Sequence, residues 1–270
     1  MAITRAVILA RGLGTRMRRD DDAPTLDAGQ AEAAKRGMKG MIPIGRPFLD
    51  YVISALADSE IRDVCLVIGP EHDAIRAHYA ATAFTRVRVA FAVQAEALGT
   101  ADAVAAARDC TGGESFLVLN SDNYYPVEAY RALRSVEGSG LVGFDYQALV
   151  KESNIPVERV RKFALVQCDA HGMLSGLVEK PDAATFERLI GSSLVSMNLW
   201  AFTPVIFEAC ARVTPSERGE LELQDAVRIA REELGERFNV VPFSGAVLDL
   251  SSRADIPAVA RALRDTEVRL

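Results

Sequence analysis

The chain has 270 residues, of which 49% are hydrophobic and 25% are charged, a composition typical of a globular protein. Its formal net charge of −6 argues against nonspecific binding of nucleic acid, which depends on a broad basic surface. No basic segment precedes a long apolar run at the N-terminus, and no apolar stretch reaches membrane-spanning length. We therefore expect a cytoplasmic protein that does not enter a membrane.

The cysteines and histidines give no sign of a metal site. The cysteines lie far apart without a Cys-x-x-Cys pair, so we expect buried thiols in a reducing compartment; they are Cys65, Cys110, Cys168 and Cys210. The histidines form no metal-ligand pattern, and we expect them at the surface; they are His72, His78 and His171.

Short apolar runs alternate with amphipathic stretches through the first half of the chain. In order, the pattern predicts a strand at Ala2–Ala10, a helix at Pro47–Asp58, a strand at Asp63–Gly69, a helix at Glu71–Thr82, a strand at Arg86–Val93, a helix at Gly99–Asp109, a strand at Ser115–Asn120, a helix at Val127–Glu137 and a strand at Ser139–Asp145. This alternation predicts an α/β fold, a Rossmann-like three-layer α/β/α arrangement with a mostly parallel central sheet. Ligands of such sheets bind at the carboxyl ends of the strands.

The pattern changes after about residue 150. Strands of a mixed sheet are predicted at Phe163–Cys168, Leu174–Glu179, Leu194–Phe202 and Asn239–Val241, and helices at Asp182–Ile190, Pro204–Ala211, Leu221–Leu234 and Arg253–Glu267. No linker rich in Gly, Pro or Ser separates the two halves. We expect one domain over residues 1–270, in which residues 151–270 add a sugar-sized pocket to a nucleotide-binding half at 1–150.

The first predicted strand ends in a glycine loop that contains Gly12 and Gly14 and is followed by Arg16 and Arg18. Glycines let a backbone approach a ligand closely, and arginine suits phosphate oxygens. Met17 stands where a dinucleotide fingerprint needs its third glycine, and the P-loop pattern is absent. We interpret the loop as a triphosphate cradle, with a plain turn as the alternative.

Residues 19–38 form a charged excursion after this loop. Composition favours a helix over Gly29–Arg36, and the whole segment is either a mobile lid or a solvated excursion. The run Asp20–Asp22 is better explained as solvated charge than as a metal cluster, because three consecutive carboxylates do not converge on one ion.

Other chemically suited residues follow apolar runs. Asp122 lies at the tip of a predicted parallel strand, a frequent Mg²⁺ position in phosphoryl chemistry. Gln94 and Gly99 could contact a base, with a capped helix start as the alternative. Lys39 could equally be an ordinary surface residue. Glu179-Lys180 and Asp249 place charges where burial is costly without a partner or a ligand.

Taken in order, these elements resemble the sugar-1-phosphate nucleotidylyltransferases, also called nucleotide-sugar pyrophosphorylases. The matching elements are Gly12-Leu13-Gly14-Thr15-Arg16, then Lys39 with Pro43-Ile44 and Arg46-Pro47, then Gln94 through Gly99-Thr100, then Asn120-Ser121-Asp122, and then Glu179-Lys180-Pro181. Asp249 stands where the family has its second metal aspartate. The resemblance covers nearly the whole chain.

The resemblance implies transfer of a nucleotidyl group from a nucleoside triphosphate to a sugar-1-phosphate, with Mg²⁺ as cofactor and pyrophosphate as the second product. UTP or dTTP is the expected donor, and CTP stays open. The implied nucleotide-binding residues are Leu9, Gly12, Gly14, Thr15, Arg16, Gln94, Gly99 and Thr100. The implied catalytic residues are Arg16, Lys39, Asp122, Lys180 and Asp249, of which Asp122 and Asp249 would hold the metal. The implied sugar-side residues are Glu179, Lys180, Asn198 and Ala164.

Several departures from the family pattern concern the ligand sites. Arg11 stands where the family usually has a small residue, and Met38 precedes Lys39 where proline is usual. Ala164 and Asn198 both replace common glycines, so the sugar is left unnamed. Members are usually homo-oligomers, although the sequence shows no interface. Two other functions stay open: transfer to a phosphorylated alcohol that is not a sugar, and nucleotide sensing without catalysis.

Overall fold

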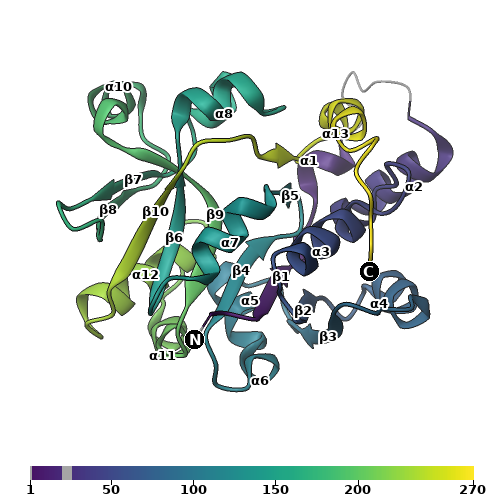
Figure 1. Cartoon of the computed structure of the whole chain (residues 1–270), viewed down its shortest axis with the longest axis horizontal. Helices are drawn as coiled ribbons and strands as arrows, with labels where there is room; N and C mark the ends of the chain where they lie inside the picture. Colours follow the sequence, from purple (N-terminus) through teal and green to yellow (C-terminus); the bar gives the residue numbers. More distant parts are fainter. Residues whose placement is uncertain (1, 20–25) are drawn as a thin grey trace.

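A nine-stranded sheet forms the centre of the protein, with helices on both of its faces (Figure 1). The structure is a computed structural model that describes residues 2–19 and 26–270. The main path of the sheet runs β10-β6-β9-β4-β1-β2-β3. Neighbours on this path pair in parallel, except that β9 is antiparallel to both β4 and β6. The predicted mostly parallel α/β fold is confirmed.

The strands and helices have the following bounds. The strands of the large sheet are β1 Arg5–Leu9, β2 Asp63–Ile68, β3 Arg88–Val93, β4 Phe116–Asn120, β6 Ser139–Phe144, β7 Leu165–Cys168, β8 Leu174–Val178, β9 Leu194–Phe202 and β10 Phe238–Phe243, and a separate pair is formed by β5 Asn123–Tyr124 and β11 Leu248–Asp249. The helices are α1 Thr15–Arg18, α2 Ala28–Arg36, α3 Phe48–Asp58, α4 Asp73–Ala81, α5 Thr100–Ala106, α6 Arg108–Thr111, α7 Val127–Arg134, α8 Tyr146–Glu152, α9 Val157–Val160, α10 Ala183–Leu189, α11 Val205–Arg212, α12 Leu223–Glu232 and α13 Ile256–Ala262, with 3₁₀ turns η1 Lys39–Met41, η2 Ile190–Ser192 and η3 Arg253–Asp255.

The strands predicted for the second half are part of the central sheet, which is mixed there because β9 runs antiparallel to its neighbours while β10 runs parallel to β6. Strand β9 inserts between β4 and β6, and β10 pairs with β6, so both belong to the sheet that the first half begins. Among the strands of this sheet in the described residues, β7 and β8 alone lie off the main path, and β7 attaches them to β9. Apolar runs predict that a strand forms, but its pairing partner is decided by long-range packing.

Two predicted helices differ in extent. The helix expected at Gly99–Asp109 is divided into α5 and α6 at Ala107. The expected closing helix is shorter, because η3 precedes α13 and α13 ends at Ala262. Pro257 lies in the first turn of α13, where its missing N–H leaves no helical hydrogen bond unmade.

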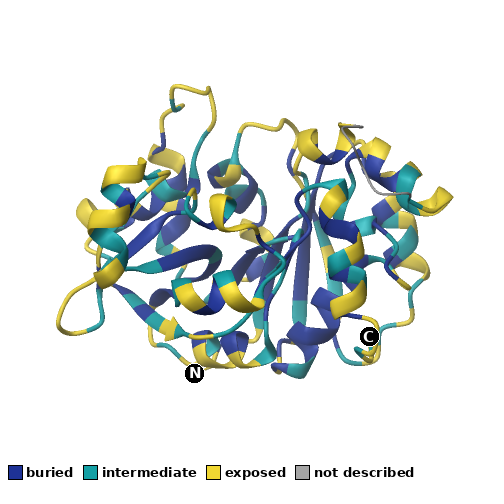
Figure 2. Ribbon diagram, turned by 90° about the horizontal axis from the view of Figure 1, so that it is seen from above, coloured by how far each residue is buried: buried dark blue, intermediate teal, exposed yellow. Residues whose placement is uncertain are grey.

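Two apolar clusters lie on opposite faces of the sheet. Along β1, Ala6 and Ile8 belong to one cluster, whereas Val7 and Leu9 belong to the other, as expected for alternating side chains. The first cluster packs against α3, α7 and α13, and the second contains residues of α5, α11 and α12. Burial follows this layering: the central strands are buried, and the outer faces of the helices are exposed (Figure 2).

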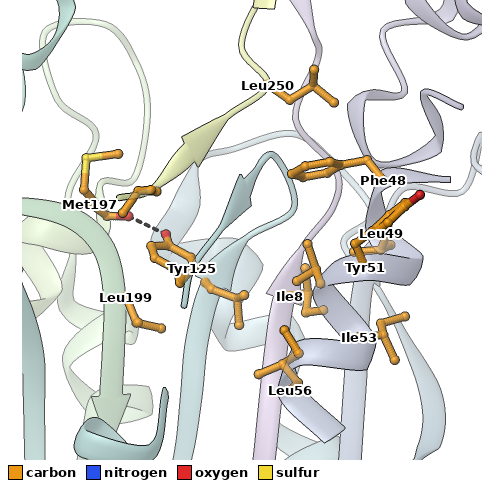
Figure 3. Packing of buried hydrophobic residues seen from close by; sticks show 14 of the residues in the cluster. Ile8, Phe48, Leu49, Tyr51, Ile53, Leu56, Tyr125, Met197, Leu199 and Leu250 are labelled. Atoms are coloured by element: carbon orange, nitrogen blue, oxygen red, sulfur yellow. Dashed lines mark hydrogen bonds between the residues drawn. The ribbon is translucent and has the colours of Figure 1, made fainter. Parts of the chain in front are cut away.

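Tyr125 joins the segment after β4 to the middle of β9. Its hydroxyl donates a hydrogen bond to the Met197 carbonyl oxygen at 2.5 Å, within the apolar cluster that also holds Phe48, Leu199 and Leu250 (Figure 3). Because Tyr125 follows Asp122 closely and Met197 precedes Asn198, this bond fixes the two predicted site segments relative to each other.

Some expectations about histidine and cysteine are wrong. His72 is buried, and its Nδ1 accepts a hydrogen bond from the Gly69 amide at 3.1 Å, so the loop after β2 folds over it. Cys168 is exposed because it ends β7 beyond the main path of the sheet, and Cys110 is partly exposed. In the parts of the chain that the structure describes, no helix is long and apolar enough to cross a bilayer.

The excursion at 19–38 contains the expected helix. Helix α2 starts with a capping box, in which Asp27 accepts from the Gln30 amide at 2.8 Å and the Gln30 side chain accepts from the Asp27 amide. It ends at Gly37, which adopts a left-handed backbone. The run Asp20–Asp22 lies outside the described residues. The lid interpretation stays a prediction.

Candidate functional site

A cavity of about 250 Å³ opens at the carboxyl ends of β1, β3 and β4. Parallel strands present their ligand sites at this edge. The predicted residues that line the cavity are Leu9, Gly12, Lys39, Gln94, Gly99, Thr100 and Asp122. Arg11, Glu220 and the turn Gly37–Gly40 also line it.

The glycine loop is held against the turn that carries Lys39. Gly14 has a left-handed backbone, with φ of 61°, and a Cβ at this position would lie 2.3 Å from the Gly37 carbonyl oxygen. The Arg18 guanidinium also donates to the Arg36 carbonyl oxygen at 3.0 Å. Gly14 is therefore needed for this contact, which places Lys39 beside the loop.

We expect Gly14→Ala to lower the free energy of unfolding by about 3 kcal/mol, because overpacking adds to the left-handed backbone cost. Gly113→Ala is the matched control: Gly113 has φ of 77° but nothing within 4 Å of an added Cβ. Gly113→Ala should lower the free energy of unfolding by only about 1 kcal/mol. Urea denaturation of both variants measures the difference, and equal losses would show that the contact with Gly37 is unimportant.

Thr15 and Arg16 begin the short helix α1, and both are exposed outside the cavity lining. The structure thus brings Gly12 into the cavity and leaves Thr15 and Arg16 at its outer side. No hydrogen bond or ion pair within the described residues holds the Arg16 guanidinium, so it is available to a ligand.

The two predicted metal aspartates lie close together. Asp249 pairs with Asn123 across β11 and β5, and the Leu250 amide donates to the Asp122 carbonyl oxygen at 2.8 Å. Burial raises the pKa of Asp249, and the nearby negative charge of Asp122 raises it further. Two-residue strands carry no periodicity, so the sequence alone could not have predicted this pairing.

Each aspartate has a basic partner. Lys39 Nζ lies 2.7 Å from Asp122 Oδ2, and Arg159 Nη1 lies 3.1 Å from Asp249 Oδ1. Arg159 also donates to both carboxylate oxygens of Asp255, at 3.0 and 3.1 Å. Arg159 is not predicted from the sequence, because α9 is a single short turn without an amphipathic pattern.

The aspartate pair fits a magnesium ion that is completed by substrate. Mg²⁺ is usually held by one or two carboxylates together with phosphate oxygens and water, rather than by a full protein cage. Accordingly, residues 2–19 and 26–270 contain no cluster of three or more Asp, Glu, His or Cys side chains suited to a metal. Asp122, which lines the cavity, and Asp249, which is buried beside it, are the two carboxylates that could hold such an ion.

The amide of Gln94 is oriented by the start of α5. Its Nε2 donates to the Gly99 carbonyl oxygen at 3.0 Å and to Asp102 Oδ2 at 2.9 Å, and the side chain is buried. The Gln94 nitrogen is thereby committed to the protein, which leaves Oε1 as the group that can read a base. Position 99 must be glycine, because an added Cβ would lie 2.4 Å from the backbone oxygen of Leu221.

The sugar-side residues lie beside one another but outside the cavity lining. Gln224 of α12 donates to Asn198 Oδ1 at 3.4 Å and lies next to the Glu179 carboxyl. Although Glu179 has exposed surface, the loss of water around its carboxyl raises its pKa. Lys180 is exposed with a left-handed backbone. Gln224 is not predicted from the sequence, because the residues around it have the pattern of an ordinary amphipathic helix.

The Ala164 carbonyl oxygen accepts a hydrogen bond from the Ser196 amide at 2.8 Å, and Ala164 is buried. This bond joins the approach to β7 to β9, two residues before Asn198. Ala164 therefore lies close along the backbone to the sugar-side residues.

The family model described as Nucleotidyl transferase matches residues 33–246 of the chain. The chain belongs to this family. Glucose-1-phosphate thymidylyltransferase of Streptomyces griseus is 27% identical over 97% of this chain and 66% of that protein. UTP--glucose-1-phosphate uridylyltransferase AglF of Haloferax volcanii is 26% identical over 97% of both chains.

This nucleotidyl transferase also has the fold of solved relatives. UDP-glucose pyrophosphorylase complexed with UDP-glucose superposes with a TM-score of 0.73 at 19% identity, covering 98% of this chain and 100% of that one. At that identity the likeness shows the fold alone. The chain spans only 66%, 57% and 46% of three of the curated relatives that it matches.

Proposed function

We propose that this nucleotidyl transferase moves a nucleotidyl group from UTP or dTTP to a sugar-1-phosphate and releases pyrophosphate. The observation that carries the proposal is that Lys39 and Asp122 line the cavity as an ion pair, with Asp249 buried directly beside Asp122. The names of two relatives, a thymidylyltransferase and a uridylyltransferase, support the choice of donor. CTP stays open as a donor.

The reaction needs positioning and charge neutralisation more than proton transfer. The attacking oxygen of a sugar-1-phosphate is already anionic, so no general base is required, and the barrier falls as negative charge is offset around the α-phosphorus. Lys39 lines the cavity, where it is paired with the Asp122 carboxylate, and its ammonium group can donate to a phosphate oxygen. Arg16 lies exposed at the outer side of the cavity, where no other described residue holds its guanidinium, and it can meet the outer phosphates.

Asp122 and Asp249 would hold Mg²⁺, which would supply positive charge to both reacting phosphates. Arg159 keeps the Asp249 carboxylate oriented through a second contact with Asp255. The adjacent carboxylates of Asp122 and Asp249 favour catalysis over nucleotide sensing, because a protein that only binds a nucleotide does not need both of them.

The acceptor site would lie beside Asn198 and Gln224. The Glu179 carboxylate can accept from a sugar hydroxyl, and the Gln224 amide lies beside it. Lys180, exposed next to Glu179, suits the phosphate of the acceptor. The sugar itself is not specified by these residues. A cytoplasmic location and a homo-oligomeric state stay predictions.

The proposal is tested by measuring pyrophosphate release across a matrix of nucleoside triphosphates and sugar-1-phosphates, with Mg²⁺ and with EDTA. We expect turnover with UTP or dTTP and at least one sugar-1-phosphate, and loss of turnover in EDTA. Tight nucleotide binding without turnover for every pair would instead favour a sensor. Turnover only with phosphorylated alcohols that are not sugars would overturn the acceptor class.

A further inference from the structure

Arg11 carries a buried donor that nothing in the described chain satisfies. Its side chain is only 10% exposed and lines the cavity, and its Nη1 has no hydrogen-bond partner among residues 2–19 and 26–270. Leaving a buried, charged donor unpaired is costly. A guanidinium in this position is therefore suited to an acceptor that arrives with a ligand.

The direction of the Arg11 side chain shows which part of the ligand it meets. Its Nε lies 3.5 Å from Glu71 Oε1, and Glu71 follows β2. In the sheet, β1 lies between β4 and β2, and β3 follows β2 (Figure 1). Arg11 thus extends toward β2 and β3, the side that carries Gln94. Asp122 follows β4, on the opposite side of β1.

Gln94 supplies the complementary half of a base-reading pair. With its nitrogen bonded to Gly99 and Asp102, it offers only the Oε1 acceptor. Arg11 offers only donors, because a guanidinium has no acceptor. Together they match a base edge on which a ring N–H stands next to a carbonyl oxygen.

We propose that Arg11 selects keto bases by donating from Nη1 to a base carbonyl oxygen, while the adjacent ring N–H donates to Gln94 Oε1. This inference rests on the proposed function and specifies its donor. Uracil, thymine and guanine present such an edge. When its amino side faces Arg11, cytosine or adenine places a lone pair against Gln94 Oε1 and an amino group against Arg11, so both contacts become repulsive. Cytosine that turns its O2 carbonyl toward Arg11 still places the lone pair of its N3 against Gln94 Oε1.

Calorimetry of UTP, dTTP, GTP, CTP and ATP, without a sugar-phosphate, tests selection independently of turnover. Wild type should bind UTP and dTTP about tenfold or more tightly than CTP and ATP. Arg11→Met keeps the length of the side chain but removes its donors. This substitution should lower the affinity for UTP and dTTP by about tenfold and change the affinity for CTP and ATP by less than about threefold.

Arg16→Met is the matched control, because a phosphate contact should weaken all five nucleotides to the same extent. If Arg11→Met lost the same binding affinity for all five nucleotides, Arg11 would be shown to contact phosphate, and the inference would be overturned. If the variant fails to fold, a wild-type protein that binds CTP as tightly as UTP would overturn it as well. If wild type binds no nucleotide, the proposed function itself fails. If wild type makes a nucleotide-sugar and Arg11→Met keeps its base preference, only this inference fails.

Discussion

Asp122→Asn and Asp249→Asn should each lower kcat for pyrophosphate release by about a thousandfold or more, with the fold retained. Each change keeps the shape of the side chain and removes the negative charge that would hold the metal against the reacting phosphates. Arg159 still bonds Asp255 in Asp249→Asn, so the local packing has a remaining anchor. Steady-state kinetics and circular dichroism of the purified variants measure the two effects separately.

Asp73→Asn is the control for these substitutions. Asp73 lies on α4 with 91% of its side chain exposed, and its replacement should leave kcat unchanged. Undiminished turnover in both Asp122→Asn and Asp249→Asn would refute the assignment of these residues to a metal. Loss of secondary structure in either variant would show a structural role for that carboxylate.

Lys39→Met should lower kcat/KM for the nucleoside triphosphate by about a hundredfold. The substitution removes the cation that lies 2.7 Å from Asp122 and leaves one fewer charge to offset the phosphates. Steady-state kinetics with the triphosphate as the varied substrate measures the loss. Lys35→Met, on the exposed face of α2, is the matched control and should behave as wild type. A Lys39→Met enzyme with unchanged kcat/KM would show that Lys39 only pairs with Asp122.

The sequence predicts the elements better than their arrangement. Buried runs such as Phe116–Asn120 and Leu194–Phe202 specify strands directly, because both faces of the strand are apolar. That these two runs pair antiparallel depends on packing across the whole sheet. The sequence pattern therefore predicts the strands of the second half but not their places within the central sheet.

The candidate site shows the same division. The resemblance selected Gly14 and Gly99, but their surroundings show that Gly37 and Leu221 require them to be glycine. Contacts between distant segments, such as that of Arg159 with Asp249, leave no local pattern. Arg11 was visible in the sequence as a departure from the family, but its unpaired Nη1 became evident only from its burial.

The central claim is attack by the sugar phosphate on the α-phosphorus. Its most direct test uses a sugar-1-phosphate with ¹⁸O in its phosphate oxygens, supplied together with UTP or dTTP, and mass spectrometry of both products. We expect the nucleotide-sugar to retain all of the label and the pyrophosphate to contain none. Labelled pyrophosphate, or phosphate released without a nucleotide-sugar, would contradict it.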